Sequence, residues 1–255
     1  MASLGPEGLM GSLLMGDLAS LTEIMSEGKS GSFFYFSHDM KFMVKTISLE
    51  EFQFFKEILG GYHKHVISNP LTLLSRLLGM YKMKIQTPSS TERLYFVVMN
   101  NLFYTDRVIN RRFDLKGSFV GRISTEQERA DATIALKDQD LDIMKEMITI
   151  DRKSLELAKA EITKDVGFLA EMHIMDYSLL LGISELTEDE KANLDIQDIS
   201  GNDIHPLARQ LGGVRSLDPE TGQPGDCIYY IGIIDILIHY NARKAAETQI
   251  KGTSS

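Results

Sequence analysis

The apolar residues of this chain follow a strand-like period in the first half and a helix-like period in much of the second. Residues 31–47, GSFFYFSHDMKFMVKTI, contain two aromatic or branched runs around Ser37-His38-Asp39, which predicts a β-hairpin. Residues 48–62 predict a helix that begins after the N-cap Ser48 and ends at Gly60 and Gly61. Residues 73–85 and 93–104 predict two further strands, joined by a turn.

The second half has a different pattern. Residues 140–174 carry the periodicity of two helices, and a short apolar stretch follows at 175–186. Residues 185–226 are rich in Asp, Glu, Gly and Pro, which indicates an acidic, loop-heavy insert. A strand at 227–234, then Asp235 and a helix at 236–251 complete the pattern. The sequence therefore predicts an α+β chain, with a mostly β part followed by a mainly helical part.

Composition excludes several classes of protein. The net charge of −9 argues against a general nucleic-acid-binding surface, although it leaves room for a local anion site. No apolar run approaches the roughly 18 residues that span a bilayer, and residues 1–21 make a poor secretion signal. The single cysteine, Cys227, cannot form an internal disulfide. We expect a cytosolic or nuclear protein without a transmembrane segment.

Gly28-Lys29-Ser30 matches the end of a P-loop, G-x-x-x-x-G-K-S, but the match is partial. The first glycine of that motif is replaced by Glu23, an anion where phosphate should lie. A glycine-rich lid over a nucleotide is the better interpretation, because Gly28 and Gly31 let backbone amides approach phosphate oxygens closely.

Lys45 is the better candidate for a phosphate contact. It shares a strand face with Met43 and Ile47, beneath the predicted lid. A helix with Glu50 and Glu51 follows, as in protein kinases, where a strand lysine pairs with a helix carboxylate. The alternative is a surface lysine on a half-buried strand.

Two aspartates, Asp176 and Asp235, stand nearly alone among apolar neighbours. A desolvated carboxylate is costly unless it is paired, hydrogen-bonded or bound to metal. The pair fits a catalytic base and a Mg²⁺ ligand, or two helix N-caps. Lys116 in FDLKGS is either a turn residue or a phosphate contact. The basic residues between 107 and 122 form either a solvated face or an anion-binding face.

Five pieces of the sequence together resemble the phosphatidylinositol phosphate kinase family, although HRD, DFG and GxGxxG motifs are absent. They occur in family order from about residue 28 to residue 251, and are GKSGSFFYFSHDMKFMVKTI, FVVMNNLFYTDRVINRRFDLKGS, LKDQDL, IMDYSLLLGI and YYIGIIDIL. The resemblance implies a two-lobed kinase-like fold, with an antiparallel-sheet N-lobe and a mainly helical C-lobe. It also implies transfer of the ATP γ-phosphate to an inositol ring hydroxyl, with Mg²⁺.

The resemblance also implies a role for individual residues. Asp176 would orient or deprotonate the attacking hydroxyl, Asp235 would hold Mg²⁺, and Lys45 and Lys116 would contact phosphate. Glu51 would be the helix carboxylate, and Arg111 and Arg112 would face anionic lipid. The lid and the adenine-binding hinge would be formed by Gly28, Ser30, Gly31, Ser32, Phe33, Met99, Asn101, Leu102 and Phe103.

The implied domains are an atypical segment at 1–27, an N-lobe with lid and hinge at 28–104, and a C-lobe at 105–255 that stops before the activation segment. The implied location is the cytosolic face of membranes, where a phosphatidylinositol monophosphate would be converted to phosphatidylinositol 4,5-bisphosphate. Some family members dimerise. The alternatives are a catalytically weak or inactive scaffold that binds nucleotide or lipid, and a protein kinase proper.

Overall fold

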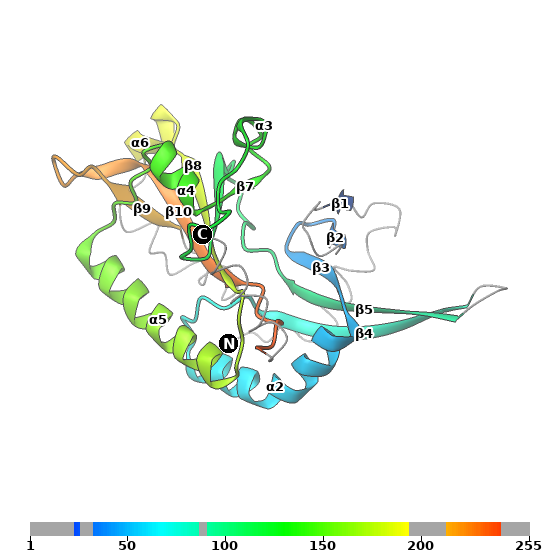
Figure 1. Ribbon diagram of the computed structural model, residues 1–255. Helices are drawn as coiled ribbons and strands as arrows, with labels where there is room; N and C mark the ends of the chain where they lie inside the picture. The colour runs from blue at the N-terminus through cyan, green and yellow to red at the C-terminus, as the bar shows by residue number, and fades with distance from the viewer. Residues whose placement is uncertain (1–22, 26–32, 87–90, 194–212, 241–255) are drawn as a thin grey trace.

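The computed structural model describes residues 23–25, 33–86, 91–193 and 213–240 (Figure 1). Within these ranges the chain forms two five-stranded sheets and five helices. None of these helices is both long enough and apolar enough to cross a membrane.

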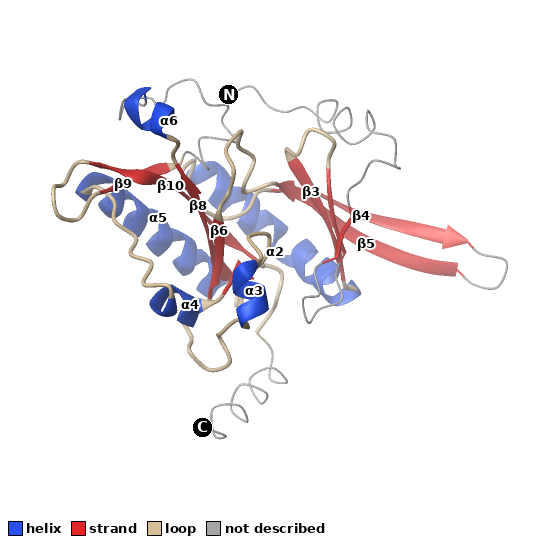
Figure 2. Ribbon diagram, turned by 90° about the horizontal axis from the view of Figure 1, so that it is seen from above, coloured by secondary structure: helices blue, strands red, loops and turns tan. Residues whose placement is uncertain are grey.

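The first sheet is antiparallel and has the order β1-β2-β3-β5-β4. Its strands are β1 (Glu23–Met25), β2 (Phe33–Phe36), β3 (Phe42–Ile47), β4 (Leu77–Gln86) and β5 (Thr91–Asn100). The predicted hairpin is confirmed, because β2 and β3 pair across a turn in which the Ser37 amide donates to the Phe42 carbonyl, at 2.9 Å. Strands β4 and β5 extend well beyond the rest of the molecule as a long hairpin (Figures 1 and 2).

The second sheet has the order β7-β6-β8-β10-β9 and is antiparallel except for the β6–β7 pair. Its strands are β6 (Arg111–Leu115), β7 (Ala135–Leu136), β8 (Ser178–Glu185), β9 (Val214–Leu217) and β10 (Pro224–Ile234). The prediction of a mainly helical second half missed this sheet, which lies beside four helices in the described residues. The apolar run of β8 has inner residues that are buried or half-buried on both faces, so it lacks the alternation that marks a one-sided strand.

The helices are α2 (Leu49–Ser68), α3 (Glu126–Ala130), α4 (Asp138–Ile143), α5 (Arg152–Glu171) and α6 (Glu188–Asn193). The predicted N-cap is confirmed: the Ser48 hydroxyl accepts from the Glu51 amide, and the Glu51 carboxylate accepts from the Ser48 amide. The predicted end at Gly60 and Gly61 is wrong. Helix α2 continues because its second half packs on α5, and Gly61 admits the Met172 side chain beside the helix.

The predicted helix at 236–251 is not present in its described part. Asp235 has a left-handed backbone, and the following residues turn so that His239 forms a bridge with Ile174. Residues 241–255 lie outside the described ranges.

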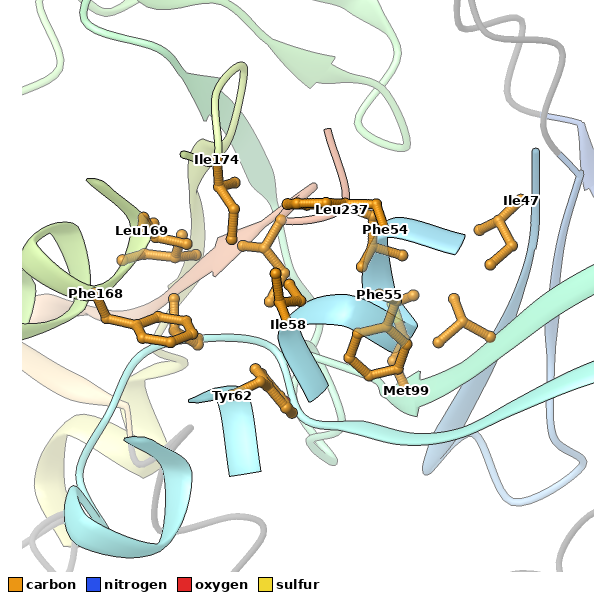
Figure 3. Close-up of a cluster of buried hydrophobic side chains, with 14 of the residues drawn as sticks. Ile47, Phe54, Phe55, Ile58, Tyr62, Met99, Phe168, Leu169, Ile174 and Leu237 are labelled. Atoms are coloured by element: carbon orange, nitrogen blue, oxygen red, sulfur yellow. The ribbon is translucent and has the colours of Figure 1, made fainter. Parts of the chain in front are cut away.

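The largest hydrophobic cluster joins both sheets and the two long helices. It combines Phe54, Phe55, Ile58 and Tyr62 of α2 with side chains from α5, β3, β5 and the end of β10 (Figure 3). Helices α2 and α5 lie beside each other on one side of the molecule (Figure 1). This core therefore contains residues from both sides of the predicted boundary at 104/105.

Candidate active site

The ends of three neighbouring strands meet at one edge of the second sheet. Leu115 of β6 pairs with Leu179 of β8, and Ser178 of β8 pairs with Ile234 of β10. Lys116 directly follows β6, Asp176 lies just before β8, and Asp235 directly follows β10. Strand register therefore gathers Lys116, Asp176 and Asp235, although they are far apart in the sequence.

Asp176 and Asp235 share an unusual backbone. Their φ angles are +57° and +61°, in the left-handed region that few residues other than glycine adopt. The two segments that carry these aspartates are hydrogen-bonded to each other, because the Met175 amide donates to the Ile238 carbonyl at 2.9 Å. Strained backbone of this kind is concentrated at functional sites.

Lys45 reaches this edge from the first sheet. Its Nζ donates to Oδ1 of Asp235 at 2.8 Å, and it also lies 5.4 Å from the centre of the Phe34 ring. The Lys45 side chain is 13% exposed and that of Asp235 is 32% exposed, so the ammonium is more sheltered than the carboxylate. An anionic ligand could therefore contact Lys45 at a site that also offers carboxylate oxygens.

Lys116 is held at both its backbone and its side chain. Its Nζ donates to the backbone carbonyl of Asp176 at 2.9 Å. The amides of Lys116 and Gly117 both donate to Oδ1 of Asp138, at 3.0 and 2.8 Å. Gly117 has φ +65°, a conformation for which glycine is well suited. The ammonium group is thus fixed beside the turn that carries Asp176.

The segment 99–103, which contains the end of β5 and the residues after it, packs on the second sheet at two glycines. A side chain at Gly232 would overlap Leu102, and one at Gly182 would overlap Phe103. The Asn101 side chain donates to the Met40 carbonyl at 2.8 Å and accepts from the Phe103 amide at 3.0 Å. Asn101 thus ties the β2–β3 turn to this segment, and its side chain is engaged within the protein.

Comparison with known proteins identifies the family of the chain. A family profile described as phosphatidylinositol-4-phosphate 5-kinase matches residues 15–255. The chain belongs to this kinase family. Its members are named for phosphorylating lipid, which is consistent with two ammonium groups and two carboxylates at one sheet edge.

Several curated relatives of this kinase family are similar to the chain. A phosphatidylinositol 4-phosphate 5-kinase of Plasmodium falciparum is 38% identical, over 97% of this chain and 15% of the relative. A phosphatidylinositol 4-phosphate 5-kinase of Schizosaccharomyces pombe is 32% identical, over 91% of this chain and 38% of the relative. The human phosphatidylinositol 5-phosphate 4-kinase type-2 alpha is 30% identical, over 87% of this chain and 60% of the relative. The chain therefore spans between 15% and 60% of the length of these relatives.

The structure brings together four of the predicted kinase residues and leaves others apart. Glu51 is engaged in the α2 capping box, whereas the ion pair of Lys45 is with Asp235. Phe33 begins β2, where it pairs with Met25. The remaining predicted lid residues, Gly28, Ser30, Gly31 and Ser32, lie outside the described ranges.

Two arginines of the basic run have partners within the fold, and their predicted lipid contact stays a prediction. Arg111 forms ion pairs with Glu146 and Glu185, and its side chain is 25% exposed. Arg112 donates to the carbonyls of Ile109 and Ala132 and lies 5.6 Å from the centre of the Phe103 ring. Arg112 therefore contacts the segment 99–103, whereas Arg111 links β6 to β8 and to Glu146.

Sequence reasoning missed Asp138, which lies in the piece LKDQDL. Besides the two loop amides, it accepts from Nε of Arg122 at 2.7 Å. Burial raises the pKa of Asp138, but the hydrogen bonds from Arg122 and the Gly117 amide outweigh it, so the pKa lies below the ordinary aspartate value. The run of three aspartates at 138–142 resembles an ordinary acidic helix start, so the sequence alone does not distinguish it.

Proposed function

We propose that this chain carries the nucleotide and lipid headgroup site of an ATP-dependent phosphatidylinositol phosphate kinase. The observation that carries the proposal is the 2.8 Å contact between Lys45 and Asp235, which joins the first sheet to the edge where Lys116 and Asp176 meet. Family membership supplies the chemistry that such a set of charges would serve.

The proposed product is phosphatidylinositol 4,5-bisphosphate. The relatives are named either phosphatidylinositol 4-phosphate 5-kinases or phosphatidylinositol 5-phosphate 4-kinases. Each name describes addition of the phosphate that its substrate lacks, so both reactions end at the same bisphosphate. The non-catalytic alternative is not favoured, because these relatives carry the names of enzymes.

Each charged residue then has a specific task. Lys45 neutralises the ATP phosphates, and Lys116 neutralises charge that develops on the transferred phosphoryl group. The Asp176 carboxylate orients the inositol hydroxyl and accepts its proton as the new phosphate ester forms. The protein contributes mainly by positioning these groups and by balancing charge. Residues 28–33 would cover the phosphates, and residues 99–103 would border the adenine.

Asp235 fits the role of a Mg²⁺ ligand. Protein sites hold Mg²⁺ through one or two carboxylates, with water and substrate phosphates completing the shell. The Asp235 carboxylate is partly exposed, and its oxygen atoms are hard ligands of the kind that Mg²⁺ prefers. The described residues hold no group of three or more His, Cys, Asp or Glu side chains that could bind a metal ion. Bound Mg²⁺ would neutralise phosphate charge during transfer.

The proposal also concerns where the enzyme works. Its substrate would be an anionic lipid at the cytosolic surface of a membrane. The enzyme would bind that surface as a peripheral protein. Arg111 and Arg112 are the proposed contacts to that surface, beside the partners that they have within the fold.

The test is lipid phosphorylation by the full-length protein that contains this chain. Vesicles carrying either monophosphate isomer are incubated with ATP and Mg²⁺, and the bisphosphate is quantified. We expect Lys45→Met to reduce turnover about 100-fold or more, because the phosphates lose their cation. Lys84→Met, at an exposed position on β4, is the matched control and should leave turnover unchanged. Equal labelling by the unchanged protein and Lys45→Met would contradict the proposal.

A further inference from the structure

Asp138 of helix α4 holds the loop that carries Lys116. One carboxylate oxygen accepts from two consecutive amides of the loop, Lys116 at 3.0 Å and Gly117 at 2.8 Å. Two hydrogen bonds to one oxygen fix the direction in which the backbone leaves β6. The orientation of the Lys116 side chain depends on that direction.

The other carboxylate oxygen of Asp138 fixes the far end of the same loop. It accepts from Nε of Arg122 at 2.7 Å, and Nη2 of Arg122 in turn donates to Oδ1 of Asp114 at 3.0 Å. The Gln139 amide also donates to the Arg122 carbonyl at 3.0 Å. The loop from Lys116 to Arg122 is therefore closed onto the start of α4, and Asp138 contacts both of its ends.

The loop is otherwise exposed, which makes this anchor important. Phe119 and Val120 are 66% and 68% exposed and so provide little packing. The Asp138 side chain is only 10% exposed and is charge-paired with Arg122. Asp138 contacts residue 116 at its backbone amide, whereas the Lys116 ammonium contacts the Asp176 carbonyl. Asp138 thus acts on the ammonium indirectly.

We propose that Asp138 is a positioning residue for phosphoryl transfer, which holds the 116–122 loop so that the Lys116 ammonium lies at the Asp176 turn. This inference rests on the proposed lipid kinase function. Asp138 does not itself touch the reacting groups. Its loss should act through Lys116 alone.

The experiment combines two substitutions in the full-length protein. In Asp138→Asn, the new amide group faces the Nε donor of Arg122, so the loop loses part of its anchor. We expect kcat to fall about 10- to 100-fold while the KM for ATP changes little. In a Lys116→Met background, measured under single-turnover conditions at high enzyme concentration, Asp138→Asn should have almost no further effect. Asp142→Asn, exposed on the same helix, is the matched control and should leave kcat unchanged.

Hydrogen exchange separates loop anchoring from activity. Asp138→Asn should increase amide exchange in the 114–122 peptide and leave α5 peptides as they were. Arg122→Gln, which removes the other half of the contact, should increase exchange in the same peptide.

Two results would overturn the inference. One is unchanged exchange in the 114–122 peptide of Asp138→Asn. The other is a loss of kcat that is as large with Met at position 116 as with Lys, since the effect would then be general. Absence of lipid phosphorylation by the unchanged protein is a separate outcome, which refutes the proposed function while exchange still decides whether Asp138 anchors the loop.

Discussion

Asp176 and Asp235 both have a left-handed backbone conformation, which most residues other than glycine avoid. The left-handed region costs an ordinary L-residue about 1–2 kcal/mol, whereas aspartate and asparagine tolerate it through local hydrogen bonds. Glycine would suit the backbone alone at both positions. Carboxylates at φ +57° and +61° are consistent with the proposed roles of Asp176 as a proton acceptor and Asp235 as a Mg²⁺ ligand.

Substitutions at Asp235 should separate backbone strain from charge. We expect Asp235→Ala to lower the free energy of unfolding by about 1 kcal/mol more than Asp235→Asn, because asparagine tolerates the left-handed backbone. Both variants should lose lipid kinase turnover, since neither keeps the charge. Denaturant unfolding measures the difference, and a Lys45→Met background removes the contribution of the ion pair. Equal stabilities in that background would show that strain at Asp235 is negligible.

At the scale of elements, the segment 99–103 is positioned by two glycines of the second sheet. Leu102 covers Gly232 of β10, and Phe103 covers Gly182 of β8. In the strand register, Gly182 pairs with Tyr230, two residues before Gly232, so the two contacts are neighbours. The missing side chains let the linking segment lie directly on the sheet that carries Asp235.

Gly232→Ala should displace this segment. The added methyl group would overlap Leu102, and overpacking of this kind costs about 1–3 kcal/mol. We also expect weaker stabilisation by ATP in a thermal shift assay, because the proposed adenine contacts move. Gly167→Ala is the control: this α5 glycine has open space, so the variant should gain about 0.5–1 kcal/mol. If Gly232→Ala is as stable as the unchanged protein, the close packing described here is incorrect.

Elements with a local signal were predictable, and those fixed by tertiary contacts were not. The β2–β3 hairpin follows from turn residues, and the start of α2 follows from Ser48 and Glu51. The end of α2 depends on packing against Phe168 and Met172, which are distant in sequence. Strand β8 is buried on both faces and therefore carries no period that separates it from a helix.

The site was predictable where a charge is isolated. Asp176 and Asp235 stand out because apolar residues surround them, whereas Asp138 lies in an acidic run in which any member could be solvated. The internal partners of Arg111 and Arg112 could not be predicted from the sequence. Their glutamate and carbonyl partners come from other segments, so neutralisation of the basic run emerges only in the fold.

At the scale of the whole molecule, one buried carboxylate connects the two long helices to the candidate site. Asp165 of α5 is fully buried and accepts hydrogen bonds from His65 of α2, the Thr72 hydroxyl and the Leu73 amide. The Leu73 carbonyl in turn accepts from the Ile233 amide at 2.7 Å. A continuous path of hydrogen bonds thus runs from α5, through the segment before β4, to the end of β10 beside Asp235.

Removing this carboxylate should destabilise both halves of the molecule together. In Asp165→Ala, three donors lose their acceptor inside the core, and we expect the free energy of unfolding to fall by about 3 kcal/mol or more. Glu156→Ala, exposed on the same helix, is the control for helix propensity and should change stability little. Denaturant unfolding followed by hydrogen exchange should show lost protection in α2, α5 and β10 alike, since they share one core. A loss confined to α5, or a difference from the control below about 0.5 kcal/mol, would mean that Asp165 does not couple the two sheets.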